Sequence, residues 1–316
     1  MKDYIIDGHA DTILNFFNKE NYVFDKINPD SHIDLPRLKE ADIAIETFAL
    51  CVEDEYIKKS PIKRTIQLMD RLIYLNNKYN ELVLIKSYKD IDEILNKNKI
   101  GAIMAIEGAY GVFDLSALRI FYQLGLRLIT LTWNYSNHLA TGIGEDKGNK
   151  GITEMGKSFI AEMNRLGIII DVSHISPESF WDVIKYSKKP IVASHSNVKN
   201  ICNHPRNLND DQIIAIANSG GIIGINFYPK FLSNSTRADI FDIIKHINYI
   251  KELVGIEYIG FGTDYDGIDY TPEGMEDISS MKNLKKILLE NNFKMSEINK
   301  LFHGNWLRVF KEVFDD

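Results

Sequence analysis

Short apolar runs, separated by longer amphipathic segments, form the dominant pattern of the chain. The runs are rich in Ile, Val, Leu and Phe without polar alternation, which is typical of strands covered on both faces. Gly or Pro beside several runs also favours strands over buried helix segments. The predicted strands are Tyr4–His9, Ile43–Cys51, Ala102–Glu107, Arg127–Trp133, Gly167–His174, Pro190–His195, Gly221–Tyr228 and Tyr258–Asp264.

The segments between the runs carry apolar residues at helical spacing and predict helices. Strands that alternate with helices, in a total of eight, predict an α/β fold, a (β/α)8 TIM barrel, as one domain over residues 1–316. An open doubly wound sheet is the alternative, but the chain has no Gly-x-Gly-x-x-Gly turn after the first strand. The predicted helices are Pro61–Tyr79, Ile91–Asn98, Leu115–Leu124, Thr153–Leu166, Pro177–Ser187, Asp210–Asn218, Arg237–Val254, Ser279–Asn291 and Met295–Phe314.

Composition narrows the class of protein. The chain has 316 residues, 45% hydrophobic and 26% charged, which is ordinary globular composition and excludes disordered or fibrous proteins. Its net charge of -7 argues against nucleic-acid and anionic-membrane partners. The sequence shows no leader-like start and no apolar run long enough to span a bilayer. Cys51 and Cys202 form no metal knuckle or disulfide framework. We therefore expect a cytoplasmic protein without membrane or nucleic-acid partners.

Polar residues collect where the apolar runs end. In a barrel the carboxyl ends of the strands meet at one face, where active sites lie. Burying several imidazoles and carboxylates there is costly without a cation. The candidate residues at these ends are His9, Asp11, Glu107, His174, His195 and Asp264.

Imidazoles and carboxylates without thiolates suit zinc or a similar divalent ion. His9 and Asp11 stand two residues apart on an extended segment, so both can bind one ion. Glu107 has two oxygens with which to bridge two ions, and His174 and His195, from neighbouring strands, can hold the second ion. The sequence thus predicts two Zn2+ ions, about 3.5–4 Å apart, that share a hydroxide.

The other histidines divide into two groups. His138 and His204 lie in predicted loops above the same face, and their role stays open. His32, His246 and His303 lie outside the candidate set and are expected to be structural.

A series of short motifs extends along nearly the whole chain. In this order they resemble the membrane (renal) dipeptidase family, in its bacterial-type zinc dipeptidase form, a branch of the amidohydrolase-like barrels. Each motif alone is weak evidence, whereas the ordered set is specific. The motifs are Asp7-Gly8-His9-Ala10-Asp11, Asp34-Leu35-Pro36-Arg37-Leu38, Ile106-Glu107-Gly108, Leu131-Thr132-Trp133-Asn134, Asp171-Val172-Ser173-His174, Ala193-Ser194-His195-Ser196, His204-Pro205-Arg206-Asn207, Gly224-Ile225-Asn226-Phe227-Tyr228, Gly262-Thr263-Asp264-Tyr265-Asp266-Gly267 and Gly304-Asn305.

The resemblance implies roles for further residues. It implies a binuclear zinc site on the ligands predicted above. It makes Asp264 the catalytic acid and base, beside the metals and counted among the candidate ligands. Arg206 matches the residue that holds the substrate carboxylate, and Tyr228 matches a tyrosine near the substrate.

One position departs from the mammalian members of the family. They carry a histidine, thought to polarise the scissile carbonyl, where this chain has Trp133. Asn134, His138 or a metal ion are the remaining candidates for that task, and the sequence does not choose between them.

The expected activity is that of a zinc-dependent dipeptidase. Its substrates would be dipeptides with a free C-terminal carboxylate, with a D-residue allowed at the C-terminal position, cleaved through a metal-bridging hydroxide. The alternative is a related amidohydrolase that acts on another carboxylate-bearing amide, lactam or lactone. A phosphoesterase is disfavoured because Arg206 is the one plausible anion-binding arginine in the loops. An inactive metal-binding protein is disfavoured because the ligand set and Asp264 are intact. A homodimer is expected by analogy with such barrels.

Overall fold

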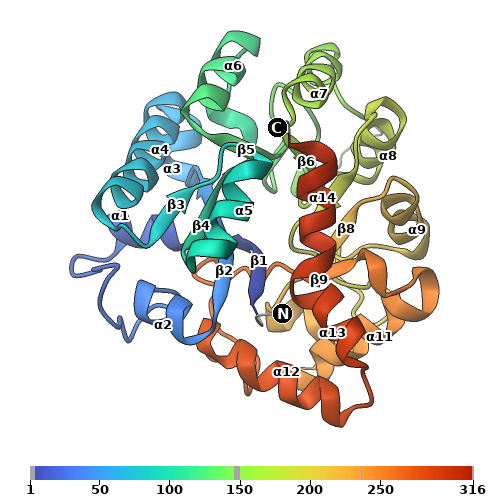
Figure 1. The fold of residues 1–316 in the computed structure, drawn as a ribbon. Helices are drawn as coiled ribbons and strands as arrows, with labels where there is room; N and C mark the ends of the chain where they lie inside the picture. The colour runs from blue at the N-terminus through green and yellow to red at the C-terminus, as the bar shows by residue number, and fades with distance from the viewer. Residues whose placement is uncertain (1–3, 146–149, 236, 315–316) are drawn as a thin grey trace.

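A closed barrel of parallel strands forms the centre of the molecule (Figure 1). The computed structural model describes residues 4–145, 150–235 and 237–314. Pairing of β2 with β4 closes the sheet, so that eight strands form a ring. The predicted (β/α)8 class is confirmed. The barrel strands are β1 Ile5–Ala10, β2 Ile43–Cys51, β4 Ile100–Glu107, β5 Leu126–Thr130, β6 Ile169–Asp171, β7 Ile191–Ala193, β8 Ile222–Ile225 and β9 Ile259–Phe261.

A further strand, β3 (Leu82–Leu84), lies outside the ring. It pairs with the first residues of β4, where Leu82 opposes Ile100 and Leu84 opposes Ala102. The sequence analysis did not predict it, because three apolar residues are too few to show a strand pattern.

Helices surround the barrel (Figure 1). The longer helices are α4 Pro61–Lys78, α5 Tyr88–Lys97, α6 Leu115–Leu124, α7 Glu154–Leu166, α8 Pro177–Tyr186, α9 Asp210–Asn218, α11 Ile240–Val254, α12 Met281–Glu290 and α14 Asn305–Val313. The shorter ones are α1 Asn15–Asn18, α2 Leu35–Glu40, α3 Asp54–Ile57, α10 Pro229–Leu232, α13 Met295–Asn299 and the 3-10 turns Thr12–Leu14, Ala109–Gly111, Ile143–Glu145, Ile256–Tyr258 and Ile278–Ser280.

Two helix predictions are corrected by local hydrogen bonding. The helix predicted over Arg237–Val254 begins at Ile240, because the side chain of Asp239 caps it by accepting from backbone N–H groups of the first turn. The helix predicted over Met295–Phe314 is divided by a π-helical turn at Lys300–Gly304.

The last helix, α14, packs closely against β1 and β9. Trp306 of α14 is fully buried and donates its indole N–H to the carbonyl of Phe261 at 3.0 Å. A Cβ atom at Gly8 would lie 2.1 Å from the Trp306 ring, so a larger residue there would displace the indole. Since Gly8 precedes His9, this contact holds the backbone beside a candidate ligand.

Candidate active site

Five barrel strands bring the candidate ligands to one end of the barrel. His9 lies within β1 and Glu107 ends β4, while the other candidates lie in the segments that follow β1, β6, β7 and β9. All are buried or nearly so. The residues brought together are His9, Asp11, Glu107, His174, His195 and Asp264.

Glu107 lies at the centre of this cluster. Its Oε1 is 3.0 Å from Nε2 of His174, 3.5 Å from Nε2 of His195 and 3.7 Å from Nε2 of His9. One carboxylate thus touches imidazoles from three strands, which is the position that a bridging ligand requires.

The second group surrounds His9. Its Nε2 lies 3.7 Å from Oδ2 of Asp11 and 4.0 Å from Oδ1 of Asp264. Within the described residues, neither His9 Nε2 nor Asp11 Oδ1 has a hydrogen-bond partner, although both atoms are buried. Buried polar atoms are nearly always satisfied, so these two atoms are suited to coordinate a cation.

Hydrogen bonds at the Nδ1 atoms of His174 and His195 determine which ring nitrogen carries the proton. His174 Nδ1 donates to Asn134 Oδ1 at 2.8 Å, since an amide oxygen only accepts. Ser194 Oγ donates to Asp171 Oδ2 at 2.6 Å and therefore accepts from His195 Nδ1 at 2.7 Å. Both rings then present unprotonated Nε2 atoms, which lie 2.8 Å apart. Two lone pairs at that distance repel unless a cation accepts them.

Burial opposes charge on the same side chains. Burial, together with the charge of Glu107, raises the pKa of Asp11 to about 8. Burial also raises the pKa of Asp264 to about 6, and burial with the nearby Arg206 cation lowers the pKa of His174 to about 4. For His9, burial lowers the pKa, but the charge of the Glu107 carboxylate outweighs burial and raises the pKa to about 10. A divalent cation bound here would stabilise the ionised carboxylates and accept the lone pairs of neutral imidazoles. The donor set therefore fits metal ions.

A cleft of about 490 Å³ lies in front of the cluster. Arg206 lines it and is only 8% exposed; its Nη2 donates to the His195 carbonyl at 3.4 Å, while its Nε has no hydrogen-bond partner among the described residues. The ring of Phe231 lies 5.5 Å from the Arg206 guanidinium. A buried cation with a free donor in a cleft is suited to an anionic ligand group.

The remaining predicted substrate residues differ in position. Tyr228 and Asn134 line the cleft, and the Tyr228 hydroxyl donates to Asp269 at 2.8 Å. His138 does not line the described cleft, because its Nε2 is hydrogen-bonded to the Val112 carbonyl at 2.9 Å. His138 thus lies outside the lining of this cleft, and Asn134 is hydrogen-bonded to His174.

Sequence reasoning missed several residues that shape the site. Asn226 donates to Asp264 Oδ2 at 2.8 Å and fixes that carboxylate. Ser194 joins His195 to Asp171, as described above. His204, whose role was open, and Trp133, which replaces the family's histidine, both line the cleft. Asn226 and Ser194 belong to motifs of the sequence, but their contacts depend on cross-strand register.

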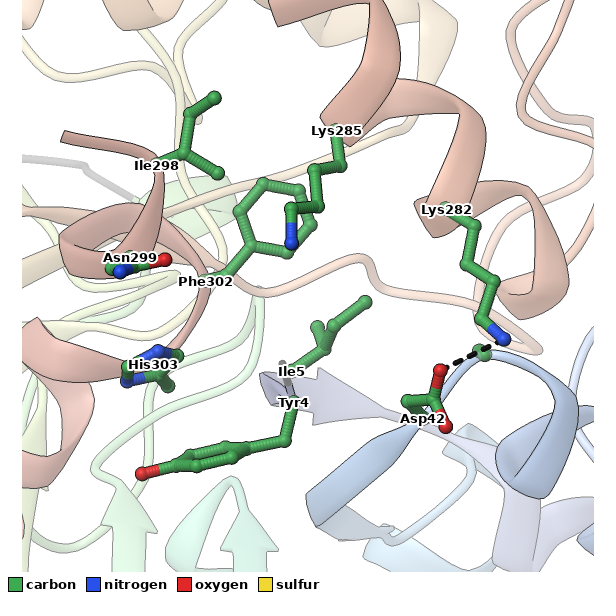
Figure 2. A pocket seen from close by; sticks show the side chains of 10 residues that line it. Tyr4, Ile5, Asp42, Lys282, Lys285, Ile298, Asn299, Phe302 and His303 are labelled. Carbon is green, nitrogen blue, oxygen red and sulfur yellow. Dashed lines mark ion pairs between the residues drawn. The ribbon is translucent and has the colours of Figure 1, made fainter. Parts of the chain in front are cut away.

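A second cavity of about 220 Å³ lies near the amino end of β1 (Figure 2). Its wall includes Tyr4, Phe302 and an ion pair of 2.8 Å between Lys282 and Asp42. None of the candidate ligands lines it. In a barrel this end contributes to stability rather than catalysis.

Sequence comparison assigns the family. The profile of the membrane dipeptidase family, peptidase family M19, matches residues 1–315. The chain belongs to the membrane dipeptidase family. Two Schizosaccharomyces pombe dipeptidases, both described as uncharacterized, are also similar. One is 33% identical over 90% of this chain and 72% of its own length, and the other is 32% identical over 98% and 81%.

Solved structures agree with this assignment. A metallopeptidase of Rhodobacter sphaeroides, crystallised with a phosphinate mimic of the dipeptide L-Ala-D-Ala, superimposes with a TM-score of 0.92 at 25% identity, over 99% of this chain and 100% of its own. Dipeptidase AC, a metallopeptidase of family M19, gives 0.92 at 26% identity, over 99% of each chain. The chain is a metallo-dipeptidase, as predicted.

The family name refers to membranes. In the described part of the chain, no helix is both long and apolar enough to cross a bilayer. The cytoplasmic location and the homodimer remain predictions.

Proposed function

We propose that this membrane dipeptidase family member hydrolyses dipeptides with a free C-terminal carboxylate, using two zinc ions. His9 and Asp11 would hold the first ion, His174 and His195 the second, and Glu107 would bridge both, with Asp264 beside them. The observation that carries the proposal is the pair of histidine Nε2 atoms, from His174 and His195, that lie 2.8 Å apart and within 3.5 Å of one oxygen of Glu107. When bound, two divalent ions polarise the scissile carbonyl and make a shared water acidic.

The protein's own residues supply binding and proton transfer. Arg206 takes the substrate carboxylate with its planar guanidinium, and Tyr228 borders the same cleft. Asp264, whose Oδ2 accepts from Asn226, takes up at Oδ1 the proton released by the attacking water and delivers it to the leaving amine, which departs poorly as an anion. Asn134 orients His174 through a hydrogen bond, and polarisation of the scissile carbonyl would fall to a bound metal ion rather than to His138.

Tolerance of either configuration at the C-terminal residue of the substrate follows from the same contact with Arg206. An arginine that binds the carboxylate constrains the side chain weakly, so either configuration is accommodated. The Rhodobacter sphaeroides relative with its L-Ala-D-Ala mimic supports acceptance of a D-residue.

The test compares dipeptides with their C-terminal amides. L-Ala-D-Ala and L-Ala-L-Ala should be cleaved, and their amides should lose about 10²-fold in kcat/KM, since a charge-assisted contact worth about 1.5–3 kcal/mol disappears. Arg206→Lys should reduce the difference, while Arg119→Lys, at an exposed arginine, should not. Equal cleavage of acids and amides would reject the anchor. Hydrolysis of a carboxylate-bearing lactone or lactam, but of no dipeptide, would establish the alternative amidohydrolase.

A further inference from the structure

The thiol of Cys51 lies inside the proposed metal centre. Cys51 is the last residue of β2, and it pairs in register with Glu107 at the end of β4. It lines the same cleft as Asp11 and Glu107 and is 8% exposed. The sequence analysis gave this cysteine no role, because no second cysteine lies near it in the sequence.

Three ligand-type atoms meet at this point. The sulfur of Cys51 and one carboxylate oxygen each from Asp11 and Glu107 all lie within 4.8 Å of one another. Asp11 is 4% exposed, and its Oδ1 has no hydrogen-bond partner in the described residues. Asp11 therefore offers a buried acceptor that a cation bound between these side chains would satisfy.

Cys202, the other cysteine, is a buried thiol with a different environment. Cys202 is also buried, but its sulfur donates to the Lys230 carbonyl at 3.3 Å. In the described residues Cys202 belongs to no cluster of ligand-type side chains. Cys51 and Cys202 thus share burial and differ in their carboxylate neighbours.

We propose that Cys51 is a sulfur ligand of the first metal ion, on the side of Asp11. Charge allows this: two divalent ions bring four positive charges, and the carboxylates of Asp11, Glu107 and Asp264 offset three of them. A thiolate makes the first position softer than its imidazole and carboxylate ligands alone, and so favours zinc and cadmium over manganese or magnesium. The inference rests on the proposed binuclear site.

Cobalt substitution tests the sulfur ligand directly. The full chain, loaded with Co2+, should show the near-ultraviolet charge-transfer band of a thiolate–cobalt bond. The matched variants are Cys51→Ser, which should lose the band, and Cys202→Ser, which should keep it. Zinc-loaded protein should show a Zn–S distance of about 2.3 Å by X-ray absorption, absent in Cys51→Ser. Cadmium affinity should fall by about 10-fold or more in Cys51→Ser and stay unchanged in Cys202→Ser.

The outcomes separate this inference from the proposed function. Wild type that binds two ions and cleaves dipeptides, but shows neither the cobalt band nor the Zn–S distance, would overturn the sulfur ligand and leave the proposed function standing. Wild type that binds no divalent ion would overturn both. A band that persists in Cys51→Ser would assign the sulfur to another residue and overturn the inference.

Discussion

Replacing Ser194 with alanine should weaken metal binding about 10- to 100-fold, although Ser194 is not a ligand. Its hydroxyl accepts from His195 Nδ1 at 2.7 Å and donates to Asp171 at 2.6 Å, in a fully buried position. Alanine removes the acceptor that keeps the proton on Nδ1. The imidazole of His195 can then carry its proton on Nε2, where it blocks a cation. The expected change equals about 1.4–2.7 kcal/mol of binding free energy.

Competition with a chromophoric chelator at neutral pH measures the two zinc affinities of each variant. Ser196→Ala is the matched control, because Ser196 is equally buried in the same segment and its hydroxyl has no hydrogen-bond partner in the described structure. Circular dichroism verifies that both variants fold. Wild-type affinity for both ions in Ser194→Ala would refute the tautomer argument, as would an equal loss in Ser196→Ala.

Three further variants test separate parts of the site and fold. Glu107→Ala should bind at most one ion per chain by elemental analysis, and a fully loaded wild type with a single ion would contradict the bridge. Asp264→Asn should reduce turnover about 10²–10⁴-fold with metal content retained, whereas unchanged turnover would exclude Asp264 as proton carrier. Burial lowers the pKa of His246 from 6.5 to about 4, so its folded form resists protonation. The free energy of unfolding should therefore fall by up to about 3 kcal/mol as the pH is lowered from 6.5 to 4. Urea unfolding should show this slope in wild type and a smaller one in His246→Gln.

The strand ends could be predicted from the sequence because parallel strands place their carboxyl ends together. Glu107 and His195 follow apolar runs, and this position alone brings them to one face. The extra strand at Leu82–Leu84 could not be predicted, since three residues show no periodicity.

The side chains that contact the candidate ligands from neighbouring strands could not be predicted, for a different reason. Ser194 reaches Asp171 and Cys51 reaches Glu107 across neighbouring strands, and that register depends on the closure of the whole barrel. His138 is a different case. A loop position above the correct face suggested a substrate contact, but loop side chains follow no period, and this one is bound to the Val112 carbonyl.

The backbone at two candidate residues explains why strand periodicity alone does not describe the site. His174 and Asp264 have φ angles of 65° and 63°, a left-handed conformation that is uncommon outside glycine. Asp264 is held there by its N–H, which donates to the His9 carbonyl at 3.0 Å, and the His174 carbonyl accepts from Ile143 at 2.8 Å. Such conformations cost roughly 1–3 kcal/mol each and persist where the surroundings fix them. The chain turns sharply at the strand end, and this turn, rather than alternation along the strand, directs each side chain toward the cluster.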